Sequence, residues 1–151
     1  MLGRTYDGEV CSIARSLEIV GERWSLLIIR NALFAGATRF GDFQRRLGIA
    51  SNVLAARLDR FVAEGLMERA ESAGSVEYLL TEKGRDLEGV LIALTDWGDR
   101  WAAPHGRPII YRHEGCEGEV HTRVACELCG QRPAETIATP GPGMPPERWA
   151  R

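Results

Sequence analysis

The sequence predicts a mainly α-helical domain with one short two-stranded hairpin, an α+β fold, followed by a small cysteine-containing extension. Three observations lead to this prediction. Apolar residues recur at helical spacing in successive segments before Gly65, and two short apolar segments separated by a turn follow. Three of the four cysteines lie beyond Pro104. At 151 residues, the chain has room for one compact domain and an appendage.

Four helices are predicted before the hairpin, at about residues 11–20, 24–33, 41–47 and 52–64. The second is apolar on more than one side, which is typical of a central buried helix. A tight turn at residues 48–50 separates the third helix from the fourth, and Ser51 offers a hydroxyl at an N-cap position. A helix, a tight turn and a second helix, followed at once by a hairpin, is the winged form of the helix-turn-helix.

The hairpin and a long last helix complete the predicted domain, which we place at residues 1–103. Its strands cover residues 66–71 and 75–80, joined by Ser72, Ala73 and Gly74. The last helix begins at residues 81–84, ends at Pro104 and carries a near-heptad apolar row: Leu87, Val90, Leu91, Leu94, Trp97 and Trp101. One small domain cannot easily cover this row, so the sequence predicts a dimerisation helix. The alternative is a helix packed only within its own subunit.

Charge alone does not indicate nucleic-acid binding, because the net charge is −2. Residues 39–60, however, hold five arginines against two acids: Arg39, Arg45, Arg46, Arg57 and Arg60 against Asp42 and Asp59. If DNA binds, it binds there. The alternative is a solvated helical face.

Several motifs in the right order resemble the HxlR-type winged helix-turn-helix regulators, which are relatives of the larger MarR group. They are ERWSLLIIR at 22–30, Arg39-Phe40 with Leu47, SNVLAARL at 51–58, EGL at 64–66 and YLLTEKG at 78–84. The resemblance covers about residues 11–101. It implies a DNA-binding transcriptional regulator, with repression expected, and a homodimer joined through the first and last helices on a pseudo-palindromic operator. Double-stranded DNA is thus the expected partner, and the effector is not identified.

The fourth helix is the expected recognition helix. With Leu54, Leu58 and Phe61 toward the core, the helical step places Asn52, Ala56 and Asp59 on the opposite face, flanked by Val53. Asn52 can pair with an adenine, and Val53 can contact a thymine methyl. Arg57 and Arg60 are better suited to phosphates, and Ser51 either only caps the helix or also touches a phosphate.

Further cations are candidates for contacts with the DNA backbone. Arg39, Arg45 and Arg46 lie before or on the third helix; the alternative for each is a solubilising surface arginine. The wing tip, residues 72–75, carries no Lys or Arg, so Arg69 on the first strand is the nearest cation. The wing is therefore expected to contribute little.

The extension contains the pattern His113-x2-Cys116-x9-Cys126-x2-Cys129. Two closely spaced ligand pairs are typical of a tetrahedral zinc site, and four protein ligands would make it structural. We therefore expect a zinc-ribbon-like unit at residues 104–134 and a flexible Pro/Gly-rich tail at 135–151. His121 is an alternative fourth ligand to His113. The other interpretation is three reduced thiols on a loosely ordered tail.

Cys11 is a separate candidate. It falls where many members of the resembled family carry an N-terminal cysteine, and the resemblance implies a possible redox-sensing role. The alternative is packing at a dimer interface.

The sequence does not indicate a membrane protein, a secreted protein or an enzyme. No apolar run is long enough for a membrane span, and the N-terminus lacks the apolar region of a signal peptide, so a cytoplasmic protein is expected. No Ser/His/Asp arrangement, phosphate loop or acid–base pair beside an open metal site indicates an enzyme. A dimerising module that has lost DNA binding is a further alternative, favoured by the net charge of −2 and the uncharged wing tip.

Overall fold

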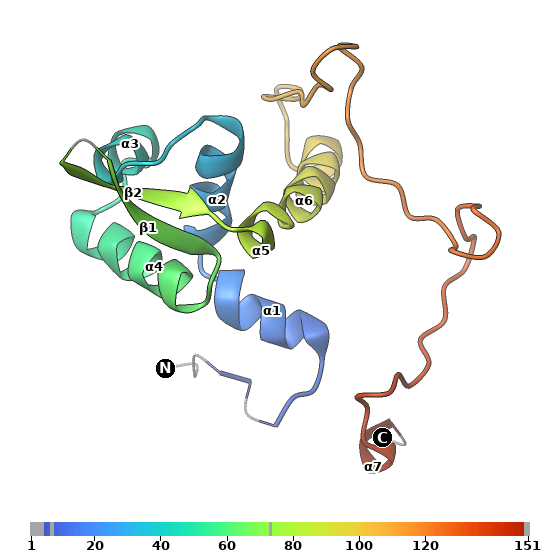
Figure 1. Cartoon of the computed structure of the whole chain (residues 1–151). Coiled ribbons are helices and arrows are strands. Elements are labelled where there is room, and N and C mark those ends of the chain that lie inside the picture. Colours follow the sequence, from blue (N-terminus) through green and yellow to red (C-terminus); the bar gives the residue numbers. More distant parts are fainter. Residues whose placement is uncertain (1–4, 7, 73, 150–151) are drawn as a thin grey trace.

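Four helices precede the hairpin in a computed structural model, which describes residues 5–6, 8–72 and 74–149 (Figure 1). They are α1 (Ser12–Val20), α2 (Ser25–Phe34), α3 (Phe40–Leu47) and α4 (Ser51–Ala63). The hairpin consists of β1 (Met67–Ser72) and β2 (Ser75–Leu80), and α5 (Glu82–Arg85), α6 (Glu88–Trp101) and α7 (Pro146–Trp149) follow. This order confirms the predicted helix-turn-helix with a hairpin wing, with element ends shifted by one or two residues.

The two strands pair antiparallel, from Met67 opposite Leu80 to Ser72 opposite Ser75. The chain entering α3 joins the free edge of β2, where the Tyr78 N–H donates to the Thr38 carbonyl at 2.7 Å. The wing is therefore attached directly to the segment that leads into the helix-turn-helix.

The core lies between α2, α4 and the base of the hairpin. Its fully buried side chains come from α2, α3, α4 and the start of the hairpin: Ile28, Ile29, Phe43, Leu54, Leu58, Phe61, Leu66 and Met67. Two sides of α2 contribute, which confirms its predicted central position. Burying apolar surface at about 25 cal/mol per Å² is the main force that fixes the orientation of α4.

The turn before α4 differs from the sequence prediction in one detail. Gly48 adopts the left-handed conformation at φ 62° and ends α3, as a tight turn requires. The N-cap of α4 is Ala50, which has no capping side chain, and Ser51 is the first helical residue. The predicted capping role of Ser51 is therefore wrong. Its hydroxyl accepts a hydrogen bond from the Gln44 amide of α3 at 2.5 Å, which joins the two helices.

The predicted single last helix is also wrong, because it is broken into α5 and α6. The Thr81 hydroxyl accepts a hydrogen bond from the Gly84 N–H at 3.2 Å and caps α5, whose C-cap is Asp86. Leu91 is buried and Leu87 packs against the core, so these two members of the predicted dimer row lie inside their own subunit.

Gly84 has a packing role that only the structure reveals. A Cβ at this position would collide with the Leu66 carbonyl and lie 2.9 Å from Leu80 Cδ2. We expect Gly84→Ala to lower the free energy of unfolding by about 1–3 kcal/mol, because the backbone must shift to admit the methyl group. Denaturant unfolding at one fixed protein concentration measures this. Gly41→Ala on α3 is the control, because a Cβ there meets nothing within 4 Å; equal unfolding free energies for the two variants would contradict the packing role.

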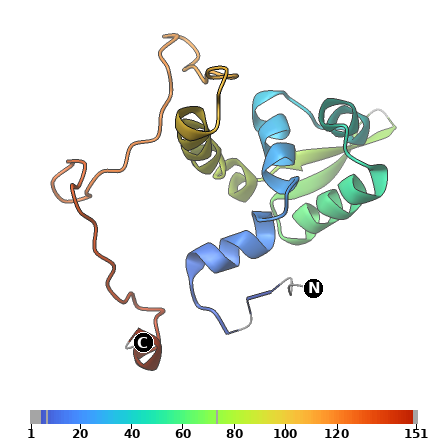
Figure 2. The ribbon, with the colours of Figure 1, turned by 180° about the vertical axis from the view of Figure 1, so that it is seen from behind.

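Beyond α6, the chain continues as a C-terminal arm, residues 104–149, that extends away from the helical domain (Figures 1 and 2). It begins with a small hairpin in which Arg112 pairs with Glu119. The end of the arm returns toward the N-terminal segment, since a Cβ at Gly8 would lie 3.1 Å from Arg148 Nη2. The helical turn α7 lies within the segment predicted as a flexible tail. Across the described parts of the chain, helices long and apolar enough to cross a bilayer are absent.

Candidate nucleic-acid interface

The outward face of α4 is the candidate surface for base contacts. Leu54, Leu58 and Phe61 are fully buried, and this stripe turns the opposite side of the helix to solvent. Asn52 and Ala56 are exposed on that side, and so are Ser51 and Asp59; Val53 is half-buried at its edge. The predicted outward face is thus confirmed.

Arg57 and Arg60 lie on the same helix but are engaged inside the fold. The Arg57 side chain is only 13% exposed and its Nη2 lies 3.3 Å from Glu22 Oε1. Arg60 Nη2 donates to the Glu18 carbonyl at 2.7 Å and lies 3.5 Å from Glu64 Oε1. Both arginines therefore fasten α4 to other parts of the domain, and this geometry does not favour the phosphate contacts expected for them.

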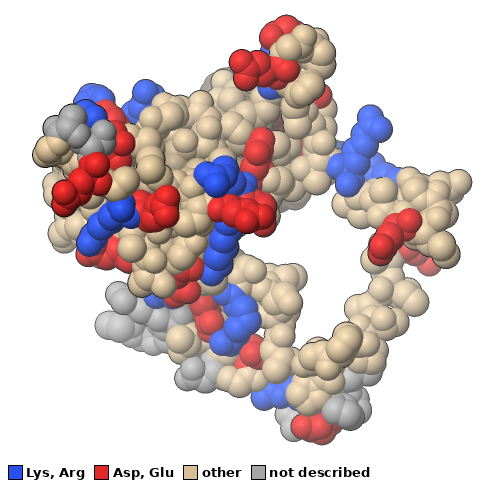
Figure 3. All heavy atoms as spheres, in the orientation of Figure 1, with Lys and Arg blue, Asp and Glu red and all other residues tan. Residues whose placement is uncertain are grey.

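The remaining arginines differ in how freely they can reach DNA. Arg39 pairs with Glu77 at 3.1 Å, Arg45 pairs with Asp42 one turn away, and Arg69 pairs with Asp59 of α4. Arg46 is exposed on α3, and the described residues give it no ion pair. On the face seen in Figure 3, basic and acidic side chains alternate over the domain. Arg46 is therefore the arginine of this window best placed for a phosphate.

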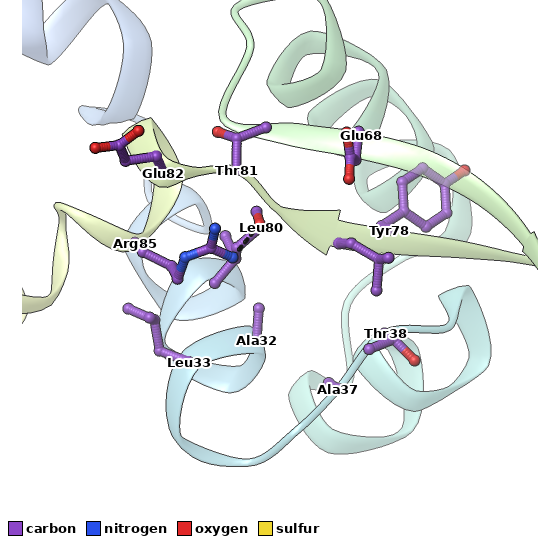
Figure 4. Close-up of a pocket in the computed structure, with 11 residues that line it drawn as sticks. Ala32, Leu33, Ala37, Thr38, Glu68, Tyr78, Leu80, Thr81, Glu82 and Arg85 are labelled. Carbon is purple, nitrogen blue, oxygen red and sulfur yellow. Dashed lines mark hydrogen bonds between the residues drawn. The ribbon is translucent and has the colours of Figure 1, made fainter.

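A pocket of about 620 Å³ lies beside the wing, between α2, β2 and the turn at α5 (Figure 4). Its volume is in the range of small-molecule sites. The charged or hydroxyl-bearing side chains that line it are Thr38, Glu68, Tyr78, Thr81, Glu82 and Arg85. The Arg85 guanidinium donates to the Leu80 carbonyl at 2.6 Å, across the end of β2. An occupant would touch both the wing and the segment that leads into α6.

An apolar face covers the outer sides of α1 and α6. Val90, Leu94, Trp97 and Trp101 follow each other at helical spacing on α6, and the two tryptophans are 61% and 66% exposed. Ile13 and Leu17 of α1 are exposed as well. Exposed tryptophans in a row of this kind are typical of an interaction surface.

The four predicted metal ligands form two separate pairs. His113 Nδ1 lies 3.1 Å from Cys116 Sγ. The Cys126 thiol has its pKa lowered by hydrogen bonds from the amides of Cys129 and Leu128 and from the Cys129 side chain. Among the described residues, no three His, Cys, Asp or Glu side chains come together as a metal site would require. The single chain therefore forms the pairs but does not join them.

His121, the alternative metal ligand, contacts two carboxylates instead. Its Nδ1 lies 2.8 Å from Asp96 Oδ1 and its Nε2 lies 3.4 Å from Glu119 Oε2. The hydrogen bond with Asp96 raises the pKa of His121, and the same bond lowers the pKa of Asp96. The Thr122 amide also donates to Asp96, at 2.9 Å. These contacts fasten the arm to α6 and favour His113 over His121 as a ligand.

Cys11 lies at the N-cap of α1, is exposed and carries a free thiol. The structure thus leaves the thiol accessible, as a redox-sensing role would need.

Comparisons with known proteins agree with this geometry. The model of the HxlR-like helix-turn-helix family matches residues 19–106. An uncharacterized HTH-type transcriptional regulator of Mycobacterium tuberculosis, Rv3095, is 42% identical over 146 residues, which cover 94% of this chain and 90% of that protein. Among solved structures, the candidate transcription factor PA1607 superposes with a TM-score of 0.80 and 38% identity over 87% of this chain and 96% of that one. The redox regulator HypR in its reduced form gives a TM-score of 0.53 and 28% identity over 60% of this chain and 92% of that one.

Proposed function

Since this chain belongs to the HxlR-like helix-turn-helix family of transcriptional regulators, we propose that it acts as a homodimer that binds a pseudo-palindromic operator in a sequence-specific manner. One observation carries this proposal. The outward face of α4 presents Asn52 between small side chains, and Arg46, to which the described residues give no ion pair, lies on the helix before it. The short amide side chain of Asn52, flanked by Ser51 and Ala56, lets α4 approach base edges closely, and Arg46 adds a phosphate contact.

The proposed homodimer forms through the apolar face of α1 and α6. A single winged helix covers only half of an operator, and a two-fold axis places two recognition helices about one helical turn of DNA apart. Burying Leu94, Trp97 and Trp101 against a second copy removes their exposed surface from water. Repression is the expected mode of regulation, because a dimer seated across two major grooves excludes other proteins from that DNA.

Two features support a response to a signal. Cys11 is the proposed redox-responsive residue: it is exposed, it lies beside the proposed dimer face on α1, and HypR is a redox regulator. The pocket of Figure 4 is the proposed route for a small-molecule effector, because its walls connect the wing to the segment before α6.

Selection of bound duplexes from a random DNA library, followed by sequencing, tests the proposed function. We expect enrichment of a sequence with two inverted half-sites whose centres lie about 10 base pairs apart. An enriched pool without inverted symmetry would contradict the dimer, and a pool with no enriched sequence would contradict specific binding.

A separate prediction concerns Arg46 and the part of the DNA affinity that does not depend on sequence. Arg46→Glu is expected to weaken binding to the selected and to random duplexes alike, by about 10-fold or more, and to reduce the slope of log affinity against log salt by about 1–2. Anisotropy titrations at several salt concentrations measure both quantities. Arg132→Glu on the arm changes the net charge equally and is the control; the same loss in both variants would mean that net charge, and not Arg46, is responsible.

A further inference from the structure

Two pairs of metal-binding side chains lie on separate turns of the C-terminal arm. The first pair, His113 and Cys116, occupies the tip of a hairpin closed by hydrogen bonds from the Val120 amide to the Tyr111 carbonyl and from the His113 amide to the Gly118 carbonyl, both 2.9 Å. A Cβ at Gly118 would lie 3.4 Å from the Cys116 sulfur, so the backbone approaches this sulfur closely. The imidazole and the thiol are 3.1 Å apart and both residues are exposed.

The second pair, Cys126 and Cys129, lies on a turn of similar construction. The Gly130 amide donates to the Cys126 carbonyl, and the Cys126 amide donates to the Gln131 carbonyl, both at 2.8 Å. Gly130 has a φ of 68°, which a Cys-x2-Cys-Gly turn needs and which other residues rarely adopt. The amides of Leu128 and Cys129 point at the Cys126 sulfur. Both thiols are free and exposed.

The two pairs are held apart by the way in which the arm is fastened. The Tyr111 ring packs against Phe34 of α2 with ring centroids 4.3 Å apart, and Asp96 of α6 forms hydrogen bonds with His121 and Thr122. The first pair is therefore fixed beside its own helical domain. After Thr122 the chain runs on in an extended form and carries the second pair away from that domain (Figures 1 and 2).

The space that the arm encloses is bordered by α1 and α6 (Figures 1 and 2). The space-filling view shows an open region between the helical domain and the arm (Figure 3). On the arm, Val124, Leu128 and Ile137 are exposed as well, at 67%, 96% and 83%. Both the helical domain and the arm thus carry exposed apolar groups, as an arm that closes over a second copy would require.

We propose that the two pairs form zinc sites between subunits: His113 and Cys116 of one subunit bind the same ion as Cys126 and Cys129 of the partner subunit. This inference rests on the homodimer proposed above. In a two-fold dimer, each arm extends over the other subunit, whose first ligand pair is fixed on its surface. One His and three Cys complete a tetrahedral site, and the dimer contains two such sites. The three thiols release their protons to solvent as they bind the ion.

A site with four protein ligands has no open position for catalysis, so its effect is on assembly. Each ion links the arm of one subunit to the body of the other. Zinc binding and dimer stability are therefore coupled, because an ion that binds the dimer and not the monomer shifts the equilibrium toward the dimer.

Complementation between two double variants tests the arrangement. Variant A carries His113→Ala with Cys116→Ser, and variant B carries Cys126→Ser with Cys129→Ser. The two are co-expressed with different peptide tags that bind no metal, and the mixed dimer is isolated by sequential affinity steps under reducing conditions. Metal analysis then gives the zinc content of the wild type, of each variant alone and of the mixed dimer.

We expect one zinc per chain in the wild type, none in variant A or B alone, and one zinc per mixed dimer, in which B supplies the first pair and A the second. A mixed dimer without zinc, beside a wild type with one per chain, would place each site within a single subunit and overturn the proposal. A zinc-free wild type would overturn the site itself. The variant His105→Ala with Cys11→Ser also removes one imidazole and one thiol, and it is expected to keep one zinc per chain.

The molecular mass of the wild type in solution, measured on the same sample by light scattering, separates this inference from the proposed function. If the wild type is a dimer and the mixed dimer holds no zinc, the proposed homodimer is supported and the zinc site between subunits is contradicted. If the wild type is a monomer, both proposals are contradicted.

Discussion

Replacing Leu94 and Trp97 with aspartate is expected to turn the proposed dimer into a monomer and to weaken binding to the proposed operator by about 100-fold or more. Both side chains lie on the open face of α6, where Leu94 is 50% exposed and Trp97 is 61% exposed. A two-fold interface would bring four new carboxylates into an apolar contact, and burying unpaired charges costs several kcal/mol. A monomer then binds each half-site independently and loses the gain from linking two recognition helices. Light scattering gives the mass, and anisotropy titration gives the affinity.

The matched control keeps the same two positions apolar. Leu94→Met with Trp97→Phe is expected to remain dimeric and to bind the operator within a few-fold of the wild type, because it retains apolar surface at both positions. Circular dichroism shows whether the aspartate variant is folded. A folded aspartate variant that stays dimeric would place the interface elsewhere, and a monomer with wild-type affinity would show that one subunit is the binding unit.

Asn52→Ala is the second large expected effect, and it should be specific to sequence. Loss of a bidentate contact to a base costs about 1–3 kcal/mol, so the two copies in a dimer together predict at least a 10-fold loss of affinity for the selected operator. Binding to a random duplex should change little, since phosphate contacts supply that affinity. Titrations against the two duplexes at one salt concentration measure the difference.

Gln131→Ala serves as the control for Asn52→Ala, because it removes an exposed amide side chain from the arm, away from α4. It should leave both affinities unchanged. An equal loss for Asn52→Ala on the operator and on the random duplex would assign Asn52 to the DNA backbone. Such a pattern is the one expected for Arg46→Glu, so the two variants together separate base contacts from phosphate contacts.

The recognition face could be predicted because it depends on local spacing. Leu54, Leu58 and Phe61 recur at helical intervals, and burying them leaves one orientation for Asn52 and Ala56. The roles of the arginines could not be predicted in this way. Arg57 and Arg60 bind Glu22 and the Glu18 carbonyl, and these partners come from a different helix and a different turn.

Two further differences between the predicted and the observed structure could not be predicted from the spacing of apolar residues. The last helix is predicted as continuous because no glycine or proline stands at residues 85–88, and the apolar row begins only at Leu87. In the structure, α5 begins at the Thr81 cap, packs Gly84 against the Leu66 carbonyl and is followed by a break at residues 86–87. In the arm, the spacing of the residues predicts one joined set of four ligands, whereas the single chain forms two separate pairs, and zinc binding stays a prediction. The contacts of Asp96 with His121 and Thr122, which hold these pairs apart, link residues about 25 positions away along the chain.

The central claim is that this regulator chooses its DNA by sequence, and a competition between two duplexes tests it most directly. The duplexes have the same length and composition: one contains the selected inverted half-sites and the other has both half-sites scrambled. Anisotropy titrations at one physiological salt concentration give the two dissociation constants. We expect the selected duplex to bind about 1,000-fold more tightly or better. Equal affinity for the two duplexes would contradict specific DNA recognition by this protein.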